Sequence, residues 1–377
     1  MTASSRSASR PTRPRHLICI GFRRWKQYNL TPILASQADH LIFVRDASAA
    51  ARLEPAPQDT LGWWSATAPD GVIELAQANA VPTWRIEDGF YRSVGLGSDL
   101  IPPASLVLDS SGIYFDPRQP SDLETLLLTS DFAPEELERA RTLRRFIIEQ
   151  GLTKYNLDPR ATAHWPGAQG RRVILVPGQV EDDASIRFGC STVRTNTALL
   201  QQARASAPDA FIVYKPHPDV MSGNRKGHVA LHKTAAWANH IETDLSVINC
   251  INAADEVHVM TSQAGFDALL RGKKVVTYGQ PFYAGWGLSE DRETNGDAFA
   301  RRQRRLSLDE LIAGALLRYP LYWDTEREQP ARCETVLRQL AQHRDRLEQS
   351  GNLAKLRTGL WRRQARKAAM LIKAMMG

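Results

Sequence analysis

The chain has 377 residues, of which 43% are hydrophobic and 24% charged, so it is long enough for two α/β units and has the composition of a globular protein. Its formal charge of +7 is uneven, because residues 1–15 and 355–377 together carry +11 without an acid and the body between them carries −4. An acidic body argues against a nucleic-acid groove. No apolar run approaches the roughly 18 residues of a membrane-spanning helix.

Four cysteines show neither a paired C-x-x-C spacing nor a metal-ligand pattern. Cys19 and Cys250 lie in apolar runs, which predicts reduced core residues. The N-terminus has no apolar leader-like region, and residues 1–15, rich in Ser, Arg and Pro, are expected to be a disordered basic tail. These features predict a cytoplasmic protein.

In the first half, the apolar runs 17–22 and 41–44 predict buried strands, and 84–86 predicts a short strand that leads into Glu87-Asp88-Gly89. Adjacent carboxylates at a strand end push two pKa values apart and can supply an acid/base group, with Arg92 neutralising one of them. The alternative is a simple Asp-Gly turn.

The next elements lead to a boundary between two units. Residues 105–115 read as a hairpin around an Asp-Ser-Ser-Gly turn, and 134–151 as a helix. The polar linker 158–170 then separates a first unit, 16–157, from a second, 171–350.

The second unit opens with the apolar run 173–176, typical of a strand buried on both faces. Pro177-Gly178 ends it, and Gln179, Asp183 and Ser185 follow. Polar groups beyond the carboxyl end of a buried parallel strand lie where open α/β sheets bind ligands. The alternative is an acidic surface loop in which Asp183 or Ser185 caps a helix.

Two further strand ends carry polar motifs. The strand 211–214 ends in Lys215-Pro-His217-Pro, where a fixed cation and an imidazole would suit a phosphate. The strand 256–260 leads into Ser262-Gln263 and a helix, which is an arrangement that can bind an anion. A rigid loop with an incidental histidine, and ordinary N-capping by Ser262, are the alternatives.

The final residues, 351–377, mix apolar side chains with cations and predict a basic amphipathic helix of the kind that lies on anionic membranes. The alternative is an end helix that docks on its own protein. Together, two α/β halves with polar strand ends predict a cleft between them and favour a glycosyltransferase that uses a nucleotide sugar.

Four segments carry a resemblance to a known family: EDGFYRSVGLGSDL (87–100), GQVEDDASI (178–186), YKPHPDV (214–220) and TSQAGFDALLRGKKVVTYGQPFYAGWGL (261–288). They closely resemble the β-Kdo transferases of Gram-negative capsule assembly, the KpsC type. The resemblance covers roughly residues 17–325. It implies an α/β GT-B-like fold of two Rossmann-like domains, and transfer of Kdo from CMP-β-Kdo with retention and without a metal or other cofactor.

The resemblance also implies residue roles. Asp183 matches the candidate nucleophile, although the sequence does not decide between it and Asp182. Glu87 matches the general acid/base position, with Asp88 beside it. The expected CMP-binding residues are Gln179, Ser185, Lys215, His217, Ser262 and Gln263.

The family places such enzymes at the inner face of the cytoplasmic membrane, acting on lipid-linked or Kdo-terminated acceptors. Its full-length members carry two transferase modules, whereas 377 residues hold one, and GFRRWK (21–26) is more similar to the start of the second module. Two rival functions are an inverting CMP-sialic-acid-type transferase and a non-catalytic capsule-assembly subunit.

Overall fold

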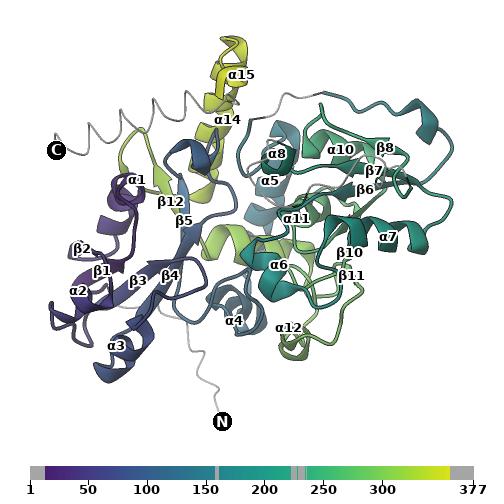
Figure 1. The fold of residues 1–377 in the computed structure, drawn as a ribbon. Coiled ribbons are helices and arrows are strands. Elements are labelled where there is room, and N and C mark those ends of the chain that lie inside the picture. Colours follow the sequence, from purple (N-terminus) through teal and green to yellow (C-terminus); the bar gives the residue numbers. More distant parts are fainter. Residues whose placement is uncertain (1–12, 158–160, 222–226, 228–233, 235, 357–377) are drawn as a thin grey trace.

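A computed structural model describes residues 13–157, 161–221, 227, 234 and 236–356. Two β-sheets flanked by helices form the two halves of the molecule, and they lie side by side in Figure 1. The α/β fold expected from the sequence is therefore confirmed. The predicted basic tails fall largely outside the described residues.

The first sheet has seven strands in the order β13-β12-β5-β4-β3-β1-β2. Strands β1 to β4 pair in parallel, β5 is antiparallel to β4, and the two late strands extend the sheet beyond β5. The strands are β1 (His16–Ile20), β2 (His40–Val44), β3 (Thr60–Trp64), β4 (Thr83–Asp88), β5 (Ser105–Asp109), β12 (Leu321–Asp324) and β13 (Gln329–Ala331).

The second sheet has six strands, all parallel, in the order β11-β10-β9-β6-β7-β8. Its central strand β6 is buried at every position, as its apolar run predicted. The strands are β6 (Val173–Pro177), β7 (Phe211–Lys215), β8 (His240–Ile241), β9 (Glu256–Val259), β10 (Lys274–Thr277) and β11 (Glu290–Asp291).

Helices cover both sheets. Those that precede the second sheet are α1 (Arg24–Ala35), α2 (Ala47–Ala51), α3 (Val72–Ala78), α4 (Asp122–Thr129) and α5 (Pro134–Gln150). Those that follow are α6 (Ala184–Gly189), α7 (Asn196–Ser206), α8 (Pro218–Met221), α10 (Val247–Ala253), α11 (Gln263–Leu270), α12 (Asp297–Arg301), α13 (Leu308–Ile312), α14 (Cys333–Gln349) and α15 (Leu353–Leu356). None of the described helices is long and apolar enough to cross a bilayer.

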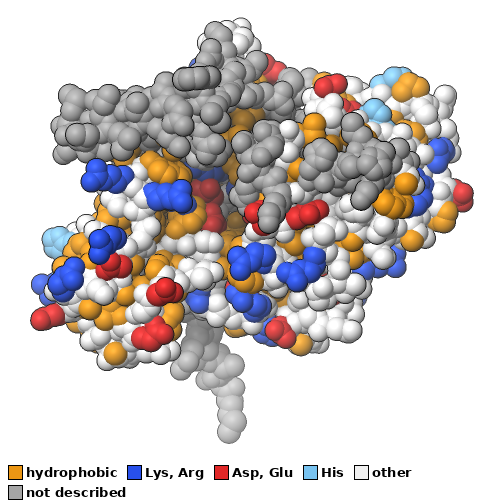
Figure 2. Space-filling model, in the orientation of Figure 1, with side chains coloured by type: hydrophobic (Ala, Val, Ile, Leu, Met, Phe, Trp, Pro, Cys, Tyr) orange, Lys and Arg blue, Asp and Glu red, His pale blue; other side chains and the backbone are white. Residues whose placement is uncertain are grey.

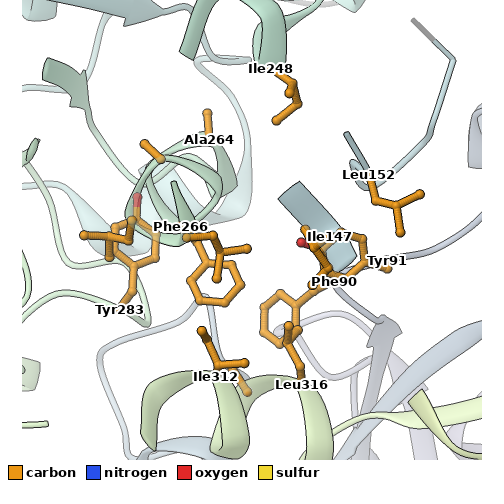
Figure 3. Packing of buried hydrophobic residues seen from close by; sticks show 14 of the residues in the cluster. Phe90, Tyr91, Ile147, Leu152, Ile248, Ala264, Phe266, Tyr283, Ile312 and Leu316 are labelled. Carbon is orange, nitrogen blue, oxygen red and sulfur yellow. The ribbon is translucent and has the colours of Figure 1, made fainter. Parts of the chain in front are cut away.

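The largest hydrophobic cluster joins the two halves. Phe90 and Tyr91, just after β4, pack in the same cluster as Phe266 of α11 and Phe282, and Figure 3 shows the rings of Phe90 and Phe266 side by side. The ring centres of Phe90 and Phe282 lie 4.6 Å apart. The halves therefore share a continuous apolar core, which fixes the end of β4 against the second sheet.

Two features differ from the sequence-based expectations. Residues 105–115 do not form a hairpin, because β5 pairs with β4 and no strand follows its turn at 110–112. Strands β12 and β13 belong to the first sheet although they lie within 171–350. The units 16–157 and 171–350 therefore do not each contain one complete sheet. The chain crosses back because β5 offers a free antiparallel edge that β12 covers.

Candidate active site

The predicted carboxylate pair lies at the carboxyl end of β4. Glu87 and Asp88 are its last two residues, and Glu87 accepts the backbone N–H of Asp88 at 3.0 Å. Asp88 forms an ion pair with the guanidinium of Arg92, with Oδ2 and Nε 2.8 Å apart, and the Arg92 side chain is only 3% exposed. The prediction that Arg92 neutralises one carboxylate is confirmed, and the paired carboxylate is that of Asp88.

The electrostatics of this strand end are perturbed. Burial, followed by repulsion from Asp88, raises the pKa of Glu87 to about 7, although Lys154 and Lys26 oppose the rise. Burial likewise lowers the pKa of Lys26 to about 8 against the pull of both carboxylates. Glu87 can therefore exchange a proton near neutral pH, which is what a general acid/base requires.

A cavity of about 220 Å³ opens beside the pair. It lies between the first turns of α1, the end of β3 and the end of β4, and Figure 2 shows acidic side chains in a hollow with basic side chains around it. Its polar and aromatic lining includes Trp25, Lys26, Asn29, Trp64, Glu87 and Asp88. The carboxylates thus face a space that a small polar ligand can enter.

A second polar cluster follows β6 in the other half. The side chain of Gln179 accepts the backbone N–H of Thr261 at 3.0 Å and lies 3.2 Å from its hydroxyl, which in turn donates to Ser185 at 3.1 Å. Asn196 holds the backbone of Gln179 through two hydrogen bonds. The strand ends of β6 and β9 are therefore joined by side chains at the edge where a parallel sheet binds ligands.

Asp183 lies on the outer side of this cluster. It is exposed, it is the N-cap of α6, and its Oδ1 accepts hydrogen bonds from the backbone N–H and the hydroxyl of Ser185 at 2.9 and 2.7 Å. This is the capping geometry that the sequence left open as an alternative. Asp182 is also exposed.

Lys215 is the last residue of β7, the neighbour of β6, and His217 follows the strand. Both are half-buried, and the backbone N–H of Gly178 donates to the carbonyl of Lys215 at 2.8 Å. A Cβ on Gly178 would lie 3.2 Å from the backbone nitrogen of His217. The structure therefore brings the His217 loop next to the Gln179 loop, as expected if both face one ligand.

Ser262 and Gln263 make different contacts at the start of α11. Ser262 caps α11 by accepting the N–H of Ala264, which is the simpler of the two alternatives for it. Gln263 donates from Nε2 to the carbonyl of Phe90 at 2.8 Å, two residues beyond Asp88. This hydrogen bond connects the polar cluster of the second half to the carboxylate pair of the first.

The two clusters are neighbours through this bridge, but they are not one network. Among the described residues, no hydrogen bond or ion pair joins Asp183 to Glu87 or Asp88. Nor does the described part of the chain contain a group of three or more His, Cys, Asp or Glu side chains arranged to hold a metal ion.

Sequence reasoning missed several members of the site. Thr261 is the centre of the second cluster, yet only its position in the Thr-Ser-Gln turn singled it out. Lys26 and Trp64 line the same cavity as the carboxylates, from α1 and β3. No spacing along the sequence reports such contacts between distant strand ends.

Comparison with known proteins identifies the family. The model of the capsule polysaccharide biosynthesis protein family matches residues 60–322. The chain belongs to this family. It is 40% identical over 337 residues to the capsule polysaccharide modification protein LipA of Neisseria meningitidis serogroup B, covering 89% of this chain and 47% of that protein. It is 39% identical over 302 residues to the lipopolysaccharide-processing protein LpsZ of Rhizobium meliloti, covering 79% of this chain and 66% of that protein. The chain thus spans about half the length of LipA.

Two solved structures of KpsC from Thermosulfurimonas dismutans share the fold. One, a β-Kdo 2,7 transferase, is 34% identical with a TM-score of 0.69 and covers 87% of this chain and 99% of its own. The other, a β-Kdo 2,4 transferase, is 30% identical with a TM-score of 0.72 and covers 87% and 98%. The resemblance to the KpsC type seen in the sequence is confirmed, and it extends over each of those chains almost completely.

Proposed function

We propose that this protein is a glycosyltransferase that moves Kdo from CMP-β-Kdo to a Kdo-terminated or lipid-linked acceptor in capsule linker synthesis, with retention of configuration. The observation that carries the proposal is the half-buried Glu87-Asp88 pair, with a Glu87 pKa of about 7, which faces a cavity of the first half and is linked to the second half through the hydrogen bond between Gln263 and Phe90. The Kdo transferase activity of the two KpsC relatives supports the choice of sugar.

Retention follows from two displacements at the anomeric carbon. In the first, a carboxylate forms a bond to that carbon and CMP departs with the electron pair of the broken C–O bond. In the second, Glu87 takes the proton of an acceptor hydroxyl, the hydroxyl oxygen attacks the same carbon, and the carboxylate leaves. A base with a pKa near 7 is matched to this proton transfer at neutral pH.

We assign the nucleophile to Asp183. Its place one hydrogen bond from Ser185, which contacts Thr261, puts it at the edge of the second-half cluster. Its Oδ1 accepts both hydrogen bonds from Ser185, and its second oxygen, Oδ2, accepts none from the described residues, so attack through Oδ2 can leave the helix cap in place. Asp88, which is held by Arg92, is the competing carboxylate.

The donor would lie across the ends of β6, β7 and β9, in the cleft of a GT-B-like pair of Rossmann-like domains. The hydroxyls of Ser185 and Ser262 can donate to phosphate oxygens, and Lys215 and His217 can offset the charge that develops on the departing phosphate. Gln179 is expected to orient Thr261 and Ser185 rather than to contact the reacting carbon. No step of this mechanism requires a metal ion.

Mass spectrometry of the protein incubated with CMP-Kdo and no acceptor tests the mechanism. A Kdo adduct on a peptide that contains Asp183 is expected, and it should be absent from Asp183→Asn. An adduct on Asp88 would refute the assignment while keeping the covalent route. Turnover without any adduct, together with an inverted product anomer by NMR, would instead indicate an inverting transferase.

We further propose that the protein acts as a peripheral enzyme at the inner face of the cytoplasmic membrane. The predicted basic helix, 351–377, falls largely outside the described residues, and only α15 at its start is described. The basis of the proposal is charge: residues 357–377 contain six cations and no acid. Each cation near an anionic leaflet contributes about 1 kcal/mol.

A further inference from the structure

The short helix α6 begins directly after Asp183 and lies at the boundary between the two halves (Figure 1). Asp183 is its N-cap, and the backbone N–H of Arg187 donates to the carbonyl of Asp183 at 3.0 Å. The helix thus joins Asp183 to Phe188, five residues and about 7.5 Å further along, as one hydrogen-bonded unit. A contact that holds Phe188 in place therefore also holds Asp183.

Phe188 makes such a contact across the boundary, with Arg118 of the first half. The guanidinium carbon of Arg118 lies 3.6 Å from the centre of the Phe188 ring, which is the distance of a stacked cation–π pair. Arg118 also donates from Nε and Nη2 to the carboxylate of Asp116, at 2.8 and 2.7 Å. The Asp116 side chain is only 1% exposed. A buried carboxylate of the first half therefore orients the guanidinium that covers an aromatic ring of the second.

The loop that carries Arg118 is itself firmly held. Arg301 of α12 donates from Nη2 to the carbonyl of Pro117 at 2.7 Å. The buried carboxylate of Glu124, in the first turn of α4, pairs with Arg301 and also with Arg302, the latter at 3.1 Å. These contacts make the loop a fixed support against which the end of α6 rests.

Contacts within the second half attach α6 to its own sheet. Ile186 is 1% exposed and packs in the apolar cluster that contains Val176 of β6. The backbone N–H of Gln280 donates to the carbonyl of Gly189 at 2.8 Å. These contacts do not involve the Phe188 ring. Removal of the ring should therefore leave the helix folded and let it shift relative to the half that carries Glu87.

We propose that Arg118 and Phe188 are positioning residues, whose stacking holds α6 against the first half and so directs Asp183 toward the side of Glu87. The inference rests on the proposed function for the roles of Asp183 and Glu87. In that mechanism the sugar–Asp183 bond forms with groups of the second half, whereas transfer to the acceptor also requires Glu87 of the first. Loss of the stacking should therefore slow the second step more than the first.

Separate measurement of the two steps tests the proposal. The whole protein is loaded with Kdo by CMP-Kdo, freed of donor and mixed with a Kdo-terminated acceptor, and mass spectrometry follows the formation and the loss of the adduct. Phe188→Leu, which keeps the ion pair between Asp116 and Arg118, should form the adduct at nearly the wild-type rate and lose it about tenfold more slowly. Arg118→Lys, which keeps a cation for Asp116 but has no planar group to stack, should show the same slow step. Phe188→Tyr keeps an aromatic ring and should restore the wild-type rate.

The pair of Arg318 and Phe132 provides a matched control. The guanidinium carbon of Arg318 lies 4.5 Å from the centre of the Phe132 ring, and the carboxylate of Glu136 pairs with Arg318. Phe132 and Phe188 are both half-buried. Phe132→Leu therefore removes a comparable contact that does not involve α6, and it should leave the rates of both steps unchanged.

Hydrogen exchange of the peptide 184–190 measures the hold on α6 without any substrate. Its amides should exchange faster in Phe188→Leu and Arg118→Lys than in wild type, and at the wild-type rate in Phe132→Leu. Unchanged exchange in Phe188→Leu and Arg118→Lys, or loss of the adduct from them at the wild-type rate, would overturn the proposal. If wild type itself forms no adduct on Asp183, the proposed function is refuted, while faster exchange in these variants would still support the hold of Arg118 on α6.

Discussion

The pKa of Glu87 leads to a prediction in which stability and activity respond in opposite directions. Glu87→Gln removes the charge and keeps the oxygen that accepts the N–H of Asp88. The rise in pKa from an ordinary 4.5 to about 7 corresponds to about 3 kcal/mol, at 1.36 kcal/mol for each pKa unit. This is the free energy that ionisation of Glu87 in the folded protein costs.

The sign of the effect follows from proton binding. The folded protein holds a proton on Glu87 between pH 4.5 and 7, where the unfolded chain has released it, so the free energy of unfolding falls as the pH rises through this window. The side chain introduced by Glu87→Gln does not titrate, so the free energy of unfolding of this variant does not fall with pH for this reason. The difference in stability between variant and wild type should therefore grow in favour of the variant by up to about 3 kcal/mol from pH 5 to pH 7.5.

Urea unfolding of both proteins at a series of pH values measures this difference. The series should stop below pH 8, because Lys26, with a pKa of about 8, titrates above it. Glu74→Gln, on the exposed face of α3, is the matched control and should show no such trend. A difference between Glu87→Gln and wild type that does not change with pH would refute the argument that Glu87 is held partly protonated.

The same variant predicts a loss of transfer. General acid/base groups typically contribute 10²–10⁴-fold to the rate, so kcat of Glu87→Gln should fall by about that factor while the kcat of wild type rises through pH 7. A wild-type profile that is flat between pH 6 and 8 would contradict the assignment of Glu87 as the base. A variant that is more stable than wild type but inactive would indicate that Glu87 serves catalysis and lowers the stability of the protein.

Three further predictions concern Asp183, Gln263 and the basic residues 357–377. Asp183→Asn keeps a side chain that can cap α6 but removes the nucleophile, so it should have the stability of wild type and transfer no Kdo. Asp183→Ala removes the cap as well, so urea unfolding should show an additional loss of about 1 kcal/mol of stability. Normal capsule assembly by cells that carry Asp183→Ala would indicate a non-catalytic subunit. Gln263→Ala removes the hydrogen bond to Phe90, so it should lower the free energy of unfolding by about 1 kcal/mol and also lower kcat. The control is Gln303→Ala, whose hydrogen bonds stay within its own loop and helix and which should keep the wild-type kcat. Equal kcat values for the two variants would contradict a bridging role for Gln263. Deletion of residues 357–377 should weaken binding to anionic vesicles in a flotation assay and spare transfer to a soluble acceptor, and unchanged flotation would refute the membrane proposal.

The central strands of the second sheet could be predicted, because they are short, largely apolar runs that polar residues follow, whereas the edge strands β8 and β11 are two residues long and were not predicted. The run 173–176 is β6 and 211–214 is β7, each within a residue of the observed bounds. Parallel strands that are buried on both faces consist almost entirely of apolar residues, so their positions can be recognised in the sequence. The loops that follow them then had to meet at one edge, as Gln179, Ser185 and Thr261 do.

The first sheet was harder to predict, because its pairing is set by distant residues. The sequence around 105–115 has the pattern of a hairpin, yet β5 pairs with β4 and later with β12, more than 200 residues away. Local patterns cannot report a partner at that separation. For the same reason, the cavity between Lys26, Trp64 and Glu87 was not visible in the sequence. Lys26 and Glu87 each follow a predicted strand, but strand β3, which ends in Trp64, was not predicted.

Phe90, two residues beyond the carboxylate pair, connects the end of β4 to the second half. Phe90 packs its ring 4.6 Å from Phe282, and its carbonyl accepts the side chain of Gln263. A movement of α11, which begins at Gln263, must therefore displace the end of β4 or break the hydrogen bond between Gln263 and Phe90. Because α11 begins directly after Thr261 and Ser262 of the proposed donor site, we expect donor binding there to act on the end of β4, which carries Glu87, through the hydrogen bond between Gln263 and Phe90. Coupling between donor binding and the pKa of Glu87 follows from this arrangement: the pH profile of kcat should shift when Phe90→Leu loosens the aromatic contact, and an unshifted profile would mean that β4 is held by its own sheet alone.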